Sequence, residues 1–299
     1  MRPWQFSKPK NPGFGLSTSY YLTVLCSKSV MPSIYEIINP SGEGGAVMGF
    51  GAPLTAPSTD KTLLHQRIER GAYVVAAKDR KSVMKMLVMS PEEAGFNPEV
   101  FAQSMLAQNT DPEIVTRIRA TWHLAQFRFE SHDAMVYPAL DLILSVVTRL
   151  AHAGDGVVAD PISQRYLLPH QVIQPERFDP RVDVREHISV KFRTRPDGIH
   201  AYTLGHQKFN LPEHEILNLF PEDQVLAEAF LMTLSQKVLV GDLTKAGELF
   251  GAPKQPFQAS AGGFDQALWN ELPVFELLPP TASTAGEALR AWAALSPTV

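Results

Sequence analysis

The fold class follows from residues 138–160, which read PALDLILSVVTRLAHAGDGVVAD. Proline opens this stretch, and its apolar residues recur at the three- and four-residue spacing of an amphipathic helix. They are Leu140, Ile143, Leu144, Val147, Leu150 and Ala151. Gly154 ends the pattern, and the apolar run that follows it predicts a buried strand. A helix followed directly by a strand indicates a mixed fold.

The preceding segment adds two strands and two short helices. Residues 83–89 form a nearly continuous apolar run, which is typical of a strand buried on both faces. Asn97-Pro98 and Asp111-Pro112 each supply an N-cap and a first-turn proline, and Phe101 and Met105 follow the first of them at helical spacing. Residues 122–129 alternate as a half-buried strand. The order β-α-α-β-α-β predicts an α+β protein that begins with a layered α/β sandwich.

A proline-rich stretch at 161–183 predicts a boundary, beyond which a β-hairpin/strand/helix subdomain is expected. Residues 188–193 alternate, Arg195-Pro196-Asp197-Gly198 supplies a turn, and 199–204 return as the second arm of the hairpin. The remaining expected elements are a strand at 215–219, a helix at 221–241, a strand at 274–278 and a helix at 285–295.

Residues 1–60 are expected to be poorly structured, because glycine and proline crowd residues 42–57. The apolar residues 20–26 faintly resemble a signal peptide, but the run is short and no cleavage site follows. Met31 is an alternative start, which would make residues 1–30 dispensable. The predicted organisation is a poorly structured segment at 1–60, an α/β subdomain at 61–165 and an α+β subdomain at 184–299.

Composition excludes several classes of protein. The net charge is −4 and the pI is about 6.1, so no basic excess points to a nucleic-acid partner. No apolar run reaches the length that a membrane span requires, so no membrane partner is expected. The single cysteine, Cys26, rules out an intrachain disulfide and fits a cytoplasmic location.

Catalytic motifs such as G-x-S-x-G and H-E-x-x-H are missing from the sequence, so no catalytic residue, metal ligand or cofactor is assigned. Histidine is concentrated at His187, His200, His206 and His214. Imidazoles bind zinc or copper and move protons near neutral pH, so a small metal-dependent hydrolase using residues 187–214 is the alternative function. The spacing fits no metal motif, which favours an interpretation of these histidines as solvent-facing strand residues.

The most distinctive stretch is residues 203–213, TLGHQKFNLPE. It resembles the T-x-G-x-x-K-F-G-x-P-E signature of a loose group of uncharacterised bacterial domain families, and a related pattern in Suppressor-of-Fused-like domains. Residues 154–160 are similar to the G-G-x-x-x-D strand that precedes the signature in those families. The sequence departs from the pattern at Asn210, where glycine is usual, and at Asp155 in the glycine pair.

This resemblance implies an α+β fold and a binding or protein-neutralising role, such as that of a toxin-immunity protein, and it transfers no catalytic residue. With the missing catalytic motifs, it predicts a non-catalytic module that binds another protein. The binding surface is expected on the exposed polar face of the hairpin and on the turn that follows. The candidate binding residues are His187, Lys191, Arg193, His200, His206, Lys208 and Glu213.

Overall fold

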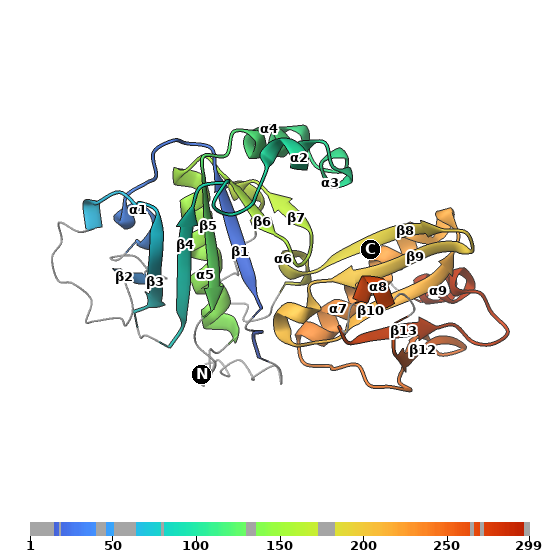
Figure 1. The fold of residues 1–299 in the computed structure, drawn as a ribbon. Helices are drawn as coiled ribbons and strands as arrows, with labels where there is room; N and C mark the ends of the chain where they lie inside the picture. Colours follow the sequence, from blue (N-terminus) through green and yellow to red (C-terminus); the bar gives the residue numbers. More distant parts are fainter. Residues whose placement is uncertain are drawn as a thin grey trace, which may run out of the picture. The chain divides into compact units, whose positions relative to one another are not determined.

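The structure, a computed structural model, contains helices and two β-sheets, so the α+β class is confirmed (Figure 1). The described residues are 15–17, 19–39, 46–50, 64–78, 81–129, 136–172, 183–263, 266–269 and 272–295. The chain divides into two compact units, a first unit of residues 15–180 and a second unit that includes residues 181–299. The division falls inside the proline-rich stretch. None of the helices in the described ranges is long and apolar enough to span a membrane.

The first unit contains a seven-stranded antiparallel sheet with the order β2-β3-β4-β5-β1-β6-β7. Its strands are β1 (Tyr21–Cys26), β2 (Ala46–Phe50), β3 (Gly71–Ala77), β4 (Val83–Met89), β5 (His123–Phe129), β6 (Val157–Asp160) and β7 (Arg165–Leu167). Strand β4 is buried on one face only, since Met84, Met86 and Val88 are buried while Lys85 is exposed. The expectation of a strand buried on both faces is therefore wrong.

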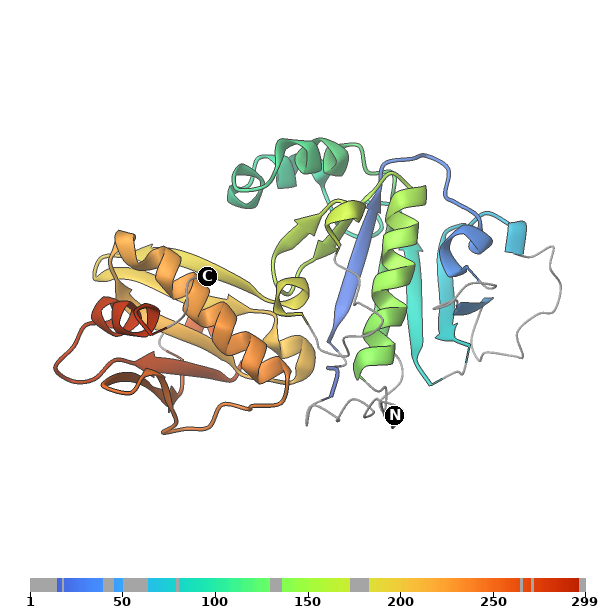
Figure 2. The ribbon, with the colours of Figure 1, turned by 180° about the vertical axis from the view of Figure 1, so that it is seen from behind.

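Helix α5 (Val136–Ala153) is the long helix that the sequence predicts, and it lies along the first sheet with the short helix α1 (Ile34–Ile38) beside it (Figure 2). Every apolar residue that defined its predicted face is buried, at 0–4 % exposure. The polar residues between them are exposed or partly exposed. The spacing pattern thus identified both the helix and its buried side.

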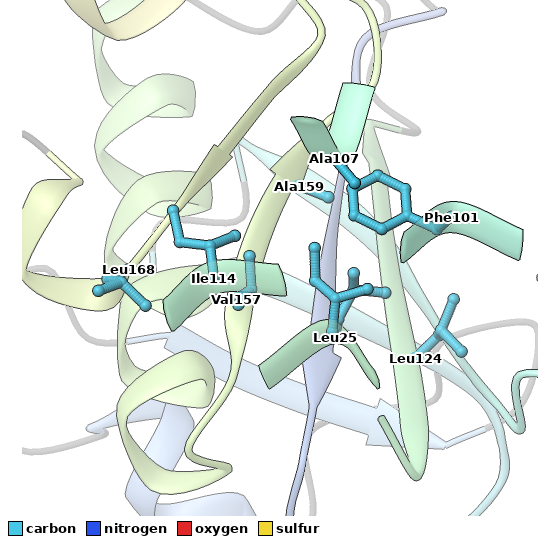
Figure 3. Close-up of a cluster of buried hydrophobic side chains, with 9 residues drawn as sticks. Leu25, Phe101, Ala107, Ile114, Leu124, Val157, Ala159 and Leu168 are labelled. Carbon is cyan, nitrogen blue, oxygen red and sulfur yellow. The ribbon is translucent and has the colours of Figure 1, made fainter. Parts of the chain in front are cut away.

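Three short helices pack on the first sheet through a cluster of buried side chains (Figure 3). They are α2 (Pro98–Ala102), α3 (Met105–Gln108) and α4 (Pro112–Arg119), which we call the helical cap. Its side chains Phe101, Ala107 and Ile114 meet Leu25 and Leu124 of the central strands. Leu25 and Leu124 are paired across β1 and β5, so they share one face of the sheet.

The sequence predicts two helices in this region, and the structure has three. Asn97 and Asp111 cap α2 and α4 as expected. The expectation that one helix contains both Phe101 and Met105 is wrong. Helix α2 ends at its C-cap Gln103, and Ser104 is the N-cap of the next helix, α3. Met105 consequently lies outside the core, at 73 % exposure.

The largest correction concerns the N-terminal segment. Strand β1 lies between β5 and β6 in the first sheet, and Leu22, Val24 and Leu25 are at most 4 % exposed. Residues 1–60 are therefore not uniformly unstructured, because β1, α1 and β2 all fall within them. The dispensability of residues 1–30 is contradicted by the same finding. The glycine-rich residues 42–45 lie outside the described ranges.

The second unit contains a six-stranded sheet with the order β11-β12-β13-β10-β9-β8. Its strands are β8 (Ser189–Arg195), β9 (Gly198–Leu204), β10 (Glu213–Leu219), β11 (Leu249–Ala252), β12 (Gln255–Ala261) and β13 (Val274–Leu278). Strands β10 and β13 are parallel, and the other pairs are antiparallel. The predicted hairpin is β8 with β9.

Helices α7 (Gln224–Leu239) and α9 (Ala285–Ala293) lie together along this second sheet (Figure 2). Phe230 of α7 joins the two layers, since its ring centroid lies 5.1 Å from those of Phe257 and Trp292. The described part of the unit also contains two four-residue α-helices, α6 (Val184–His187) and α8 (Gln266–Trp269). Residue 187 therefore ends helix α6, and the expectation that His187 is a solvent-facing residue of the hairpin strand is wrong.

Candidate functional site

The signature-like stretch forms a tight turn around one buried carboxylate, that of Glu213. Its Oε2 accepts a hydrogen bond from the Thr203 hydroxyl at 2.8 Å, and Nδ1 of His206 lies 3.0 Å from the same oxygen. Its Oε1 accepts the N–H of Gly205 at 2.8 Å and that of Gln207 at 3.3 Å. Glu213 is 1 % exposed, so these hydrogen bonds take the place of those that its carboxyl group would make with water.

The residue types at Gly205 and Thr203 are explained by further contacts in the same turn. Gly205 has φ 130°, and a Cβ there would lie 2.1 Å from the carbonyl oxygen of His187, so only glycine fits. The Thr203 hydroxyl accepts the His214 N–H at 2.8 Å, just beyond the last paired residues of β9 and β10. Thr203, Gly205 and Glu213 therefore act together to shape the turn.

A second buried carboxylate, that of Glu215, lies two residues further along β10. Its Oε2 is 2.8 Å from Nε2 of His200 and accepts the indole N–H of Trp269 at 2.8 Å. The Trp269 ring packs edge-on against Tyr202, with ring centroids 5.6 Å apart. Glu276 of β13 is paired with Glu215 across the parallel strands. Burial, and then the neighbouring Glu215, raise the pKa of Glu276, while His200 lowers it.

Three imidazoles are buried in or beside these two networks, those of His200, His206 and His214. Among the described residues, Nε2 of His206 and Nδ1 of both His200 and His214 have no hydrogen-bond partner. The other nitrogen of His214 lies 2.9 Å from the Thr244 hydroxyl. Burial, and then the neighbouring His206, hold the pKa of His214 well below its usual value. With exposed fractions of 0–1 %, these rings present no surface to a substrate.

The structure separates the seven candidate binding residues into two groups. The expectation that they lie on an exposed face is wrong for His187, His200, His206, Lys208 and Glu213, which are 0–1 % exposed. Lys191 is partly exposed and Arg193 is exposed, both on β8. Sequence parity could not reveal this burial, because the groups that enclose these side chains lie on several separate elements.

Metal ligation was the alternative for the histidine-rich region. Within the part of the chain that the structure describes, no group of three or more histidine, cysteine or carboxylate side chains is arranged to hold a metal ion. Cys26 is buried, and burial raises the pKa of its thiol to about 12. A thiol of this kind is not a reactive nucleophile at neutral pH.

A different surface stands out on the helical cap. Phe101 and Ala107 face the sheet (Figure 3), whereas Val100, Met105 and Leu106 are exposed at 64, 73 and 41 %. We call these three residues the apolar surface of the cap. The sequence signal that could have revealed them is Ser104, an N-cap residue that interrupts the helical spacing between Phe101 and Met105.

Carboxylates precede and follow the residues of this apolar surface in the sequence. Residues 86–119 contain five of them and two arginines, which gives a local net charge of −3. The carboxylates, all of which are exposed, are Glu92, Glu93, Glu99, Asp111 and Glu113. Both arginines are already paired, Arg117 with Glu113 at 3.0 Å and Arg119 with Glu99 at 3.5 Å.

Comparisons with protein-family models, with curated proteins and with solved structures find no match to this chain. The functional argument therefore rests on the geometry above.

Proposed function

We propose that the protein is a non-catalytic module that binds another protein through the apolar surface of its helical cap. The supporting observation is the exposure of Val100, Met105 and Leu106 within seven residues of one another. Single exposed apolar side chains are ordinary, whereas a group of them marks an interaction site. Methionine also adapts its shape to a partner and is enriched in protein interfaces.

The two sides of the cap have separate tasks in this proposal. Phe101, Ala107 and Ile114 anchor the short helices in the core, where they are at most 8 % exposed. Val100 and Met105 contribute little to folding, because most of their surface remains in water. Binding and stability should therefore respond to different substitutions in the same segment, residues 98–119.

In this proposal, the buried carboxylates of the second unit stabilise the fold and do not take part in a reaction. A catalytic reading would need an accessible acid, base or nucleophile, and His206 and Glu213 are enclosed. The toxin-neutralising role implied by the family resemblance is one form of the proposal, since such a protein acts by binding.

The test compares the wild-type chain with the double variant Val100→Ser and Met105→Ser. Both are immobilised, and the proteins that each retains from native cell extract are quantified by mass spectrometry. We expect at least one protein to be retained by the wild type and lost with the double variant, because the variant removes most of the apolar contact area.

A matched control is the variant Leu249→Ser, which removes an apolar side chain that is 60 % exposed in the second unit. It should retain the same protein as the wild type. Thermal unfolding of the double variant should stay within a few degrees of the wild type, since the changed side chains are exposed. Equal retention by the wild type and the double variant would refute the proposal.

A further inference from the structure

We infer that the partner presents a lysine- or arginine-rich segment that carries an apolar side chain, and that this segment docks on the helical cap. The inference rests on the proposed function and adds the chemistry of the partner. It depends on charge complementarity, which is independent of the apolar exposure that supports the function itself.

The charge around the apolar surface is negative on every flank in the sequence. Between Lys85 and Arg117 the chain contains five carboxylates and no lysine, arginine or histidine. Glu99 is the immediate neighbour of Val100 in α2, while Glu92 and Glu93 precede that helix. Asp111 and Glu113 follow α3 at the start of α4. An apolar centre with a polar, solvent-accessible rim is the usual anatomy of a protein interface.

The ion pairs of Glu93 and Glu99 leave the charge of these two carboxylates available to a partner. The contacts of Glu99 with Arg119 and of Glu93 with Arg70 are long, at 3.5 and 3.6 Å, and their side chains are at least half exposed. Exposed pairs of this kind contribute little energy and exchange readily. Among the residues that the structure describes, Glu92 makes no ion pair.

Charge complementarity then favours a protein partner over a nucleic acid or an anionic membrane. Lysine and arginine side chains of a protein would be attracted to this rim and steered onto the apolar centre. The phosphates of nucleic acids and of anionic lipids would be repelled by the same carboxylates. A basic protein segment is therefore the occupant that fits both the centre and the rim.

Two synthetic peptides of equal length test the inference against the full chain. They share leucines at helical spacing and carry either lysine or glutamate at the polar positions. Fluorescence anisotropy of the labelled peptides should show the lysine peptide binding at least about ten-fold more tightly. Its affinity should fall several-fold when NaCl is raised from about 50 to about 300 mM, because salt screens exposed charges.

Matched charge reversals locate the binding. Glu92→Lys should weaken the lysine peptide about three-fold, which is the size of one exposed charge contact. Glu228→Lys, on exposed surface of α7 in the second unit, should have no effect. The double variant Val100→Ser and Met105→Ser should weaken the peptide more than Glu92→Lys does.

Equal affinities for the two peptides would overturn the inference, and so would equal losses from the two charge reversals. These failures are distinguishable from a failure of the proposed function. If a native protein is retained through Val100 and Met105 but the peptides bind equally, only the charge inference falls. If neither depends on the cap, both fall.

Discussion

Removing residues 1–30 should prevent the first unit from folding. The chain beginning at Met31 lacks β1, which pairs with both β5 and β6 and therefore holds the two halves of the sheet together. Without it, β5 and β6 would each expose an unpaired edge.

The size of the effect follows from burial. Leu22, Val24 and Leu25 are at most 4 % exposed, and burying such a side chain contributes about 1.5–3 kcal/mol. These three side chains alone contribute an amount comparable to the whole stability of a typical domain, about 5–15 kcal/mol. The lost backbone hydrogen bonds on both sides of β1 add to this cost.

Circular dichroism and differential scanning calorimetry of the full and shortened chains measure the outcome. The shortened chain should lose a cooperative unfolding transition together with part of its strand signal. Leu25→Ala in the full chain should lower the stability of the same transition by about 2–5 kcal/mol. Val30→Ser is the matched control and should be nearly silent, since Val30 is 51 % exposed. Unchanged unfolding of the shortened chain would refute the assigned position of β1.

Three further predictions concern the core of each unit. Leu144→Ala should lower the unfolding free energy of the first unit by about 2–5 kcal/mol in denaturant titrations, because Leu144 is 4 % exposed. An unchanged unfolding free energy would mean that Leu144 does not lie on the buried face of α5. Gly205→Ala should destabilise the second unit more than Glu213→Gln, because its Cβ would meet a backbone oxygen at 2.1 Å whereas glutamine keeps one acceptor oxygen; thermal melts of the two variants decide the order. The lowered pKa of His214 means that the unfolded chain binds its proton first as the pH falls, so the stabilising effect of the neutral ring is complete above about pH 6.5 and is lost at lower pH. Melting temperatures measured from pH 7.5 to 5 should fall less steeply for His214→Gln than for the wild type, and parallel curves would contradict the assignment.

Local patterns predicted the elements whose partners are close in sequence. The spacing of Leu140 to Ala151 identified α5 and its buried face, and the alternation around the turn at residues 195–198 identified the β8–β9 hairpin. In these elements a single amphipathic pattern or one turn fixes the outcome.

Elements stabilised by distant partners were missed. Strand β1 is short, and its neighbours β5 and β6 begin only at His123 and Val157, so nothing near it in sequence reveals its central position. The burial of Glu215 depends in the same way on Trp269, which lies 54 residues away and donates to its carboxylate. Polar residues on a strand look solvent-facing until such partners are known.

The exposed surface of the helical cap was missed for a different reason. Phe101 and Met105 have the spacing of one buried helical face, and only the N-cap residue Ser104, which starts a new helix, breaks that relation. The break turns Met105 outward while Ala107 returns to the core. A boundary between two very short helices thus decides which apolar side chains are available to a partner.

The central claim, that a partner protein docks on the helical cap, is tested most directly by site-specific photocrosslinking. A photoreactive amino acid is introduced at position 105 of the cap or, as the matched control, at position 249 of β11, where the side chain is also exposed. After irradiation in cells, the account predicts a discrete crosslinked protein from position 105 and none from position 249. Crosslinking from position 249 alone, or none from position 105 while the intact chain still retains a protein, would contradict it.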